Sequence, residues 1–163
     1  MRKAFSYRLF GLGGVPRKVR PVLESEGIVV CDEGMSGRFI TNNLKAPGKR
    51  NLYRSEGFSG SLVITGKRII CHTYCKRQIN IPVDEPLVSE LQVSTPDPQT
   101  LSLSFESSDF REGWQGIVEL RFHTEKALQF RDALRSLGAK HRAAADAAQQ
   151  NADENRLNKW GSA

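Results

Sequence analysis

The chain has 163 residues, of which 39% are hydrophobic, and its formal net charge is +6. This length favours one domain with additional terminal segments. No apolar run approaches the roughly 18–20 residues of a membrane-spanning helix, which argues against an integral helical membrane protein. The three cysteines are an odd number, which argues against a disulfide framework and favours a reducing cytoplasm.

The charge is divided unevenly along the chain. Residues 1–77 hold 15 Lys and Arg against 5 Asp and Glu, a net charge of +10. Residues 78–163 hold 9 against 13, a net charge of −4. This asymmetry suggests a positive face for an anionic partner. The alternative is that strands from both halves interleave in space and remove the asymmetry.

Residues 1–26 are expected to form an N-terminal segment that can contain a short helix. The stretch VPRKVRPVLESE (15–26) carries the helix, Pro21 limits any helix before it, and Gly27 ends it. The start, MRKAFSYRLFGLGG, mixes basic and apolar residues and leaves three interpretations open. It can be an export signal, a segment on a membrane surface, or a frayed or docked segment, and we favour the last.

The next part of the chain predicts short strands. Residues 28–31 and 38–41 have strand propensity and are separated by the turn-rich DEGMSG. Residues 44–57 are expected to be a polar loop with a turn at Pro47 and Gly48. Three further strands are expected in the stretch that follows: 62–65, 68–73 and 78–82, the first two joined by a hairpin turn at Gly66 and Lys67.

The second half continues this pattern and then changes period. Apolar residues alternate with polar ones at 91–93, 101–105 and 118–122, as in half-buried antiparallel strands. In TEKALQFRDALRSLG (124–138), apolar residues have the spacing of one helical face, with Thr124 as a good N-cap. The expectation is six or seven strands followed by one amphipathic helix of roughly 13 residues.

The end of the chain differs in composition. Residues 139–163 are rich in Ala, Gln and Asn and carry few large apolar side chains before Leu157 and Trp160. Such a segment buries little surface, so we expect an Ala-rich tail that is solvated or helical.

Three motifs connect this pattern to a family. GSLVITGKRIIC (60–71) is similar to the strand–turn–strand of bacterial pleckstrin-homology-like (PH-like) and GRAM-like domains. INIPVDE (79–85) resembles the strand that follows in those families, and HTEKALQFRDALRSL (123–137) resembles their capping helix. The resemblance covers about residues 27–137 and places a PH-like domain at 27–138.

This resemblance implies a mainly β fold: a PH-like barrel of about seven antiparallel strands capped by a C-terminal amphipathic helix. Members of these families are binding modules for phosphoinositides, other lipids or proteins, and are not usually enzymes. Lipid-binding members carry basic residues in the first hairpin. The corresponding candidates here are Lys45, Lys49, Arg50 and Arg54, although three residues separate Arg50 from Arg54 where the lipid-binding pattern has one.

Further basic pairs stand at probable turns or strand ends. They are Lys67 with Arg68 and Lys76 with Arg77. If these pairs and the first four converge on one rim, they form a site for phosphate or anionic lipid. The alternative is ordinary solubilising charge. Tyr53 and Tyr74 beside the basic residues could stack nucleic-acid bases, but we rank that partner below a lipid or a protein.

The cysteines suggest chemistry only weakly. Cys71, His72 and Cys75 supply three zinc-type ligands, but Cys31, His123 and His141 stand alone, so a fourth ligand is not evident. No P-loop, G-x-G-x-x-G or G-x-S-x-G motif is present. We expect no enzymatic activity, no catalytic residues, no cofactor and no metal.

The sequence therefore predicts a cytoplasmic binding module, peripheral at a membrane in its leading form. Its ligand is an anionic lipid headgroup or another acidic surface, bound through the eight basic residues named above. The alternative is a protein-interaction or assembly domain that uses strand edges and the C-terminal tail. The sequence does not fix the oligomeric state.

Overall fold

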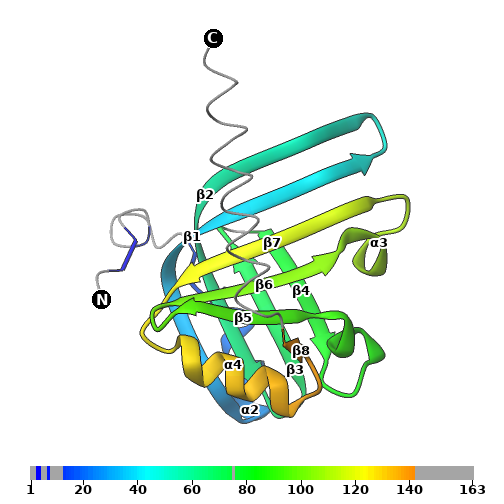
Figure 1. Ribbon diagram of the computed structural model, residues 1–163. Coiled ribbons are helices and arrows are strands. Elements are labelled where there is room, and N and C mark those ends of the chain that lie inside the picture. The colour runs from blue at the N-terminus through cyan, green and yellow to red at the C-terminus, as the bar shows by residue number, and fades with distance from the viewer. Residues whose placement is uncertain (1–2, 5–6, 8–12, 75, 142–163) are drawn as a thin grey trace.

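The fold is one curled sheet of eight strands with a helix across one end, seen in a computed structural model (Figure 1). The structure describes residues 3–4, 7, 13–74 and 76–141. The strand order is β4-β3-β2-β1-β7-β6-β5-β8. The strands are β1 (Ile28–Ala46), β2 (Lys49–Thr65), β3 (Arg68–Thr73), β4 (Lys76–Pro82), β5 (Gln92–Asp97), β6 (Thr100–Glu106), β7 (Gln115–His123) and β8 (Lys140–His141). The helices are α2 (Arg20–Ser25), η1 (Pro86–Glu90), α3 (Ser107–Phe110) and α4 (Ala127–Ser136).

The expected mainly β fold is confirmed at this level. The sheet curls into a half-barrel, and its two outermost strands are β4 and β8. Eight strands are described, where the sequence indicated about seven. The additional strand is the two-residue β8, and it pairs in parallel with β5, so the sheet is not wholly antiparallel.

The first hairpin is much longer than the sequence indicated. Two short strands and a polar loop were expected over 28–57, but β1 and β2 form one continuous ladder from Ile28–Thr65 to Ala46–Lys49. A bulge between Glu33 and Met35 lets the turn-rich segment stay within β1. The polar loop expected at 44–57 is wrong for a different reason: apart from the turn at 47–48, these polar residues lie on the two paired strands of an exposed hairpin. The turn at 47–48 is confirmed, and Gly48 adopts a φ of 72° there.

The later strands follow the expected pattern. The β2–β3 turn lies at 66–67, and β3 and β4 pair antiparallel from Arg68–Pro82 to Thr73–Lys76. β5, β6 and β7 form an antiparallel meander. β7 then pairs with β1, so the strands of the second half join the sheet beside the first hairpin.

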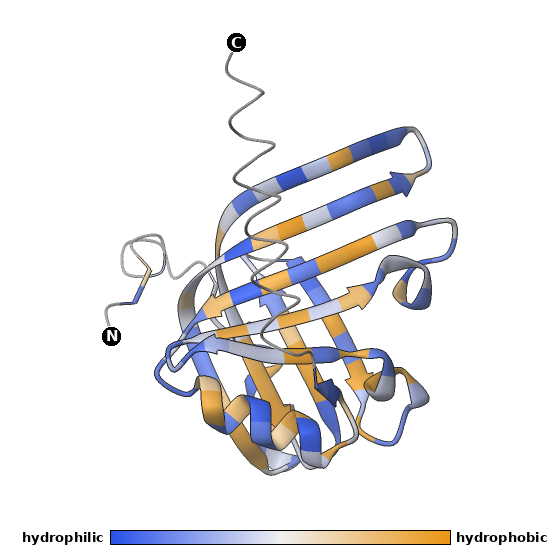
Figure 2. Cartoon of the chain, viewed as in Figure 1, coloured by the Kyte–Doolittle hydropathy of each residue, from blue (hydrophilic) through white to orange (hydrophobic). Residues whose placement is uncertain are grey.

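The main core fills the inside of the curl. Figure 2 shows hydrophobic residues along the strands of the lower half and on the helix that crosses it. Phe58 and Phe122 meet edge to face with ring centroids 5.2 Å apart. The helix α4 buries Ala127, Phe130 and Leu134 in this core. These are three of the four positions that the helical spacing predicted, and Leu137, the fourth, is half-buried.

The start of α4 differs from the expectation. The helix begins at Ala127 and has 10 residues, fewer than the roughly 13 expected. Thr124 does not cap it in the usual way: its hydroxyl accepts the N–H of Lys126 and donates to Asp32 on β1. Gly138, with a φ of 103°, ends the helix as expected.

The outer face of the sheet has its own small cluster. Leu23 on α2 and Val15 before it pack with Val63 and Ile70 of β2 and β3. The short helix expected within 15–26 is therefore present and lies on the sheet. Most of the first 12 residues and all of 142–163 lie outside the described residues. Of the start that was expected to be frayed or docked, the described Lys3 and Ala4 contact β1. Of the expected solvated or helical tail, Lys140 and His141 form β8, and the rest lies outside the described residues.

Candidate functional site

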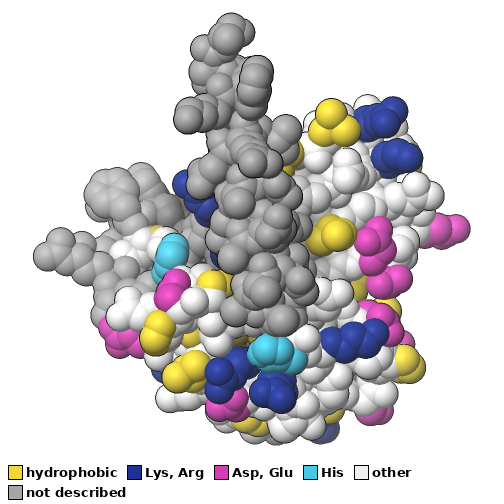
Figure 3. Space-filling model, viewed as in Figure 1, with side chains coloured by type: hydrophobic (Ala, Val, Ile, Leu, Met, Phe, Trp, Pro, Cys, Tyr) yellow, Lys and Arg dark blue, Asp and Glu magenta, His cyan; other side chains and the backbone are white. Residues whose placement is uncertain are grey.

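Three of the candidate basic residues lie together at the outer end of the β1–β2 hairpin. Lys45 is the cross-strand neighbour of Arg50, and Lys49 faces Ala46 beside the turn. All three side chains are exposed, and none forms an ion pair with a residue that the structure describes. Figure 3 shows Lys and Arg side chains at this end, with hydrophobic side chains near them.

One exposed apolar side chain accompanies these cations. Leu52 of β2 is 72% exposed, the largest value among the exposed hydrophobic residues of the described chain. It follows Arg50 by two positions, so both side chains point to the same face of β2. The hairpin end, which we define as Lys45, Lys49, Arg50 and Leu52, therefore offers charge and an apolar contact together.

Arg54 differs from the hairpin-end cations because it has a carboxylate partner. Its guanidinium pairs with Glu56 two residues further along the strand, and the two side chains are 53% and 51% exposed. An exposed pair of this kind contributes little to stability. It does reduce the positive charge that Arg54 offers to a ligand.

Lys67 and Arg68 lie at the other end of β2, far along the strand from the hairpin end. The guanidinium of Arg68 forms an ion pair with Glu26, whose side chain is only 5% exposed. Burial alone would raise the pKa of Glu26, but the hydrogen bonds from Arg68 and Thr65 outweigh it and hold that pKa below its usual value. Arg68 thus anchors the segment after α2 to the sheet.

The last basic pair, Lys76 and Arg77, begins β4. Both side chains are exposed, and their cross-strand neighbours are Thr73 and His72. The eight predicted residues therefore do not converge on one rim. Three lie at the hairpin end, Arg54 lies further along β2, Lys76 and Arg77 begin β4, and Lys67 and Arg68 lie at the opposite end of β2.

A groove of about 430 Å³ lies beside the start of β4. The residues that line it include Phe39, Phe58, Tyr74 and Lys76. The volume falls within the range of small-ligand pockets. Gln78 also lines it and is shared, with Phe39, by a narrower apolar pocket under α3 that Phe105, Phe110 and Trp114 line.

Arg111 also lines the narrow pocket. Its guanidinium carbon lies 4.9 Å from the ring centroid of Trp114, and one of its nitrogens lies 3.4 Å from the side-chain oxygen of Gln78. The sequence analysis did not identify this aromatic pocket. Phe39, Phe110 and Trp114 come from three separate elements or loops, and only the topology brings them together.

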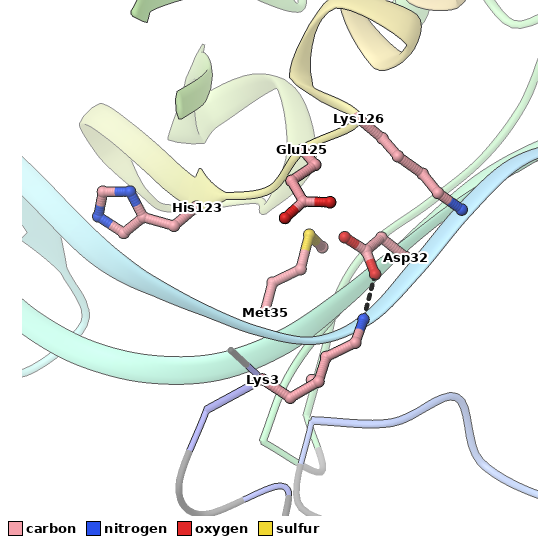
Figure 4. A pocket seen from close by; sticks show the side chains of 7 residues that line it. Lys3, Asp32, Met35, His123, Glu125 and Lys126 are labelled. Carbon is pink, nitrogen blue, oxygen red and sulfur yellow. Dashed lines mark hydrogen bonds and ion pairs between the residues drawn. The ribbon is translucent and has the colours of Figure 1, made fainter. Parts of the chain in front are cut away.

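A second, polar cleft of about 250 Å³ lies where the β1 bulge meets the start of α4. Figure 4 shows Lys3, Asp32, His123, Glu125 and Lys126 around it. Carboxylates, amines and an imidazole are residue types that are common in catalytic sites. Most of these groups instead form hydrogen bonds or ion pairs that hold parts of the chain together.

Asp32 is the centre of that network. Its carboxylate pairs with Lys3 and accepts a hydrogen bond of 2.6 Å from Thr124. Burial would raise the pKa of Asp32, but the bonds from Lys3 and Thr124 hold it below its usual value. Lys126 donates to the carbonyl oxygen of Cys31 at 2.7 Å. The cleft therefore joins the N-terminal segment, β1 and the start of α4.

The Cys71–His72–Cys75 segment shows neither a reactive thiol nor a metal site among its described residues. Cys71 is buried in the core, and burial raises the pKa of its thiol well above the usual range, which makes it a poor nucleophile. His72 is buried, and burial, with help from the charge of Arg77, lowers its pKa. Cys75 lies outside the described residues. Within the described part of the chain, no group of three or more His, Cys, Asp or Glu has the arrangement of a metal site.

Comparison with known proteins does not indicate a function, so the geometry of the candidate sites is the main basis for proposing one. No family model and no curated protein matches the chain. Among the described helices, none has the length and apolar character needed to cross a bilayer.

Proposed function

We propose that the protein is a non-enzymatic binding module that attaches to an anionic lipid surface through the hairpin end. The observation that supports this best is the position of Lys45, Lys49 and Arg50 at the tip of a hairpin, exposed and without ion-pair partners among the described residues. Cations that already have carboxylate partners, such as Arg68, contribute less to such a surface.

The geometry of the hairpin suits contact with a flat surface. β1 and β2 extend beyond the register that β3 shares with β2, which ends at Gly60 and Thr73 (Figure 1). The tip can therefore approach a bilayer without interference from β3. Leu52 lies beside the cations and can enter the headgroup region, where an apolar side chain adds to the attraction of the charges.

The expected strength of the electrostatic attraction predicts reversible attachment. Each Lys or Arg near an anionic leaflet contributes about 1 kcal/mol, so the three cations supply roughly 3 kcal/mol. Because the Debye length shortens as salt increases, this attraction weakens at higher ionic strength. The proposal thus includes a cytoplasmic protein that is peripheral at the membrane and responds to salt and lipid charge.

The proposal includes the finer fold assignment as well. A PH-like domain is compatible with an antiparallel β series closed by the amphipathic helix α4, and with a basic first hairpin. In this proposal Arg54, Lys76 and Arg77 help only if the bilayer reaches beyond the tip, whereas Lys67 and Arg68 lie at the distant end of β2 and take no part.

Liposome co-sedimentation tests the proposal. The wild type is compared with Lys45→Ala/Lys49→Ala/Arg50→Ala on neutral phosphatidylcholine vesicles and on vesicles that contain phosphatidylserine, each at low and moderate salt. The matched control is Arg17→Ala/Lys18→Ala/Lys67→Ala, which removes the same charge from exposed positions before α2 and in the β2–β3 turn.

The wild type and the control variant are expected to bind the anionic vesicles, less so as salt rises, while the hairpin variant stays in the supernatant. Equal losses for both variants would mean that only net charge matters. No binding by the wild type would reject the membrane proposal.

A further inference from the structure

Among the residues that the structure describes, no strand lies beside the outer edge of β2 over more than half of its length. β3 pairs with β2 only from Gly60 to Ile64, while β1 pairs with it as far as Lys49. Within the described residues, no strand follows the other edge of β2 between 49 and 58. An exposed edge of this length is a template for pairing with another chain.

The hydrogen bonds at its inner end show which backbone groups face outward. The hydroxyl of Tyr74 donates to the carbonyl oxygen of Gly57 at 2.8 Å, and the N–H of Tyr74 donates to the carbonyl oxygen of Ser59 at 2.6 Å. Because outward and inward groups alternate along a strand, Ser55 and Asn51 also direct their N–H and C=O away from β1. The ladder with β1 has no register shift in this region, so the alternation holds.

A docked strand would use the outward N–H and C=O groups of Asn51 and Ser55, whereas the carbonyl oxygen of Gly57 already accepts from Tyr74 and marks the inner end of the site. On that edge, neither Asn51 nor Ser55 forms a backbone hydrogen bond with another residue that the structure describes. From Asn51 to Gly57 the edge spans about 20 Å, at roughly 3.3 Å per residue, which is enough for a strand of typical length.

The groove of about 430 Å³ lies at the inner end of this edge. Glu56, Gly57 and Phe58 of β2 line it, together with Phe39 and Tyr74. A strand on the edge would direct every second side chain toward this face of the sheet. The aromatic rings therefore favour an apolar residue in the part of the incoming segment that lies against Glu56 and Gly57.

The charges at the two ends favour acidic residues there. Lys49 and Arg50 lie at one end of the edge, and Lys76 and Arg77 lie at the other. Glu56, the one acid on β2, already pairs with Arg54. A segment with an acid at each end, and an apolar residue near the end that reaches the groove, complements this arrangement.

A second copy of the chain fits less well. Antiparallel pairing of two β2 edges would place Lys49 and Arg50 of each copy near Lys76 and Arg77 of the other. Like charges opposite one another destabilise a strand pair.

We propose that the β2 edge, from Asn51 to Gly57, binds an extended acidic peptide by strand addition, with an apolar side chain of that peptide in the groove. Backbone hydrogen bonds supply affinity in this mode, and the groove supplies selectivity. The site shares Lys49 and Arg50 with the membrane proposal, but its backbone hydrogen bonds come from the side of β2 and not from the tip, so a change at Ser55 tests it separately.

A matched pair of variants at Ser55 tests the proposal. Ser55→Pro removes an outward N–H, and proline is tolerated on an edge where the N–H faces solvent, so the β1 ladder remains. Ser55→Ala keeps the N–H and removes only the hydroxyl. Circular dichroism and thermal unfolding confirm that both variants fold.

The probe is a fluorescein-labelled heptapeptide with blocked ends, Asp-Phe-Glu-Val-Glu-Phe-Asp, followed by fluorescence polarisation. A Phe near each end lets either strand direction place a ring in the groove. The wild type and Ser55→Ala are expected to bind it with affinities within about twofold of each other, and Ser55→Pro at least about tenfold more weakly. A second peptide with Lys in place of each acid is expected to bind at least about tenfold more weakly to the wild type.

Three results would overturn the proposal. The first is no binding of the acidic peptide up to about 1 mM, the limit of weak specific recognition. The second is equal binding by Ser55→Pro. The third is a wild-type dimer in analytical ultracentrifugation that Ser55→Pro dissociates, since the edge would then belong to a second copy. Vesicle binding by Ser55→Pro is expected to equal that of the wild type, which separates this test from the membrane proposal.

Discussion

The carboxylate of Asp32 accepts a hydrogen bond of 2.6 Å from the hydroxyl of Thr124, although the two residues are 92 positions apart in the chain. Asp32 lies on β1 just before the bulge, and Thr124 precedes α4. The same carboxylate pairs with Lys3. One side chain thus connects the N-terminal segment, the sheet and the helix.

Replacing Asp32 by Asn should lower stability, by an amount that depends on pH. The pKa of Asp32 is lower in the folded chain than in the unfolded chain. Its contribution is therefore complete above the usual aspartate pKa and is lost as the pH falls through the folded value. We expect Asp32→Asn to cost about 1–3 kcal/mol at pH 7 and less at acid pH. Urea unfolding between about pH 7 and pH 3 measures this difference.

The matched control is Asp84→Asn, which changes the same charge at an exposed position in the β4–η1 connection. It should alter the free energy of unfolding by less than about 0.5 kcal/mol. If Asp32→Asn and the wild type lose stability in parallel as the pH falls, the carboxylate of Asp32 has no special role.

Arg68 provides a second test, because the sequence assigned it to a ligand site and the structure pairs it with Glu26. Replacing Arg68 by Met keeps the apolar stem and leaves the buried carboxylate without its main partner. We expect a cost of roughly 1.5–3 kcal/mol, as for hydrogen bonds to a charged group. Chemical denaturation of Arg68→Met, Glu26→Gln and the double variant gives the coupling energy.

Lys67→Met serves as the control, because Lys67 is the exposed neighbour in the same turn. It should have little effect on stability. Additive costs for the two single variants would contradict an anchoring role for the Arg68–Glu26 pair. Vesicle binding by Arg68→Met should match the wild type once folding is confirmed.

Much of the strand pattern could be predicted because periodicity reports burial directly. Alternation at 101–105 and 118–122 corresponds to β6 and β7, and the 3-4-3 spacing corresponds to the buried face of α4. The long hairpin could not be predicted in this way. Outside the core, β1 and β2 have solvent beside much of their length, so polarity no longer distinguishes a strand from a loop.

The candidate surfaces were less predictable than the fold. The sequence identified the basic residues, but their grouping depends on pairing: Lys45 meets Arg50 across the turn, while Arg68 meets Glu26 at the distant end of β2. The free edge of β2 has no composition signal of its own. It exists because β3 is short and ends beside Gly60, a relation that only the register reveals.

The helix α4 offers the sharpest test of the core, because it carries a buried and an exposed leucine. Leu134 is fully buried at 0% exposure, whereas Leu128 is 44% exposed. Leu134→Ala should lower the free energy of unfolding by about 2–5 kcal/mol, since it removes apolar contacts and leaves a cavity. Leu128→Ala, the same substitution on the same helix, should cost less than about 1 kcal/mol.

Denaturant unfolding followed by tryptophan fluorescence and by circular dichroism measures both variants. The distinction between them depends on α4 packing into the curl with Ala127, Phe130 and Leu134 inward. Helix propensity cannot produce the difference, because both variants change it equally. Similar costs at the two positions would show that α4 is not docked in this orientation, and the end of the half-barrel would then need another cover.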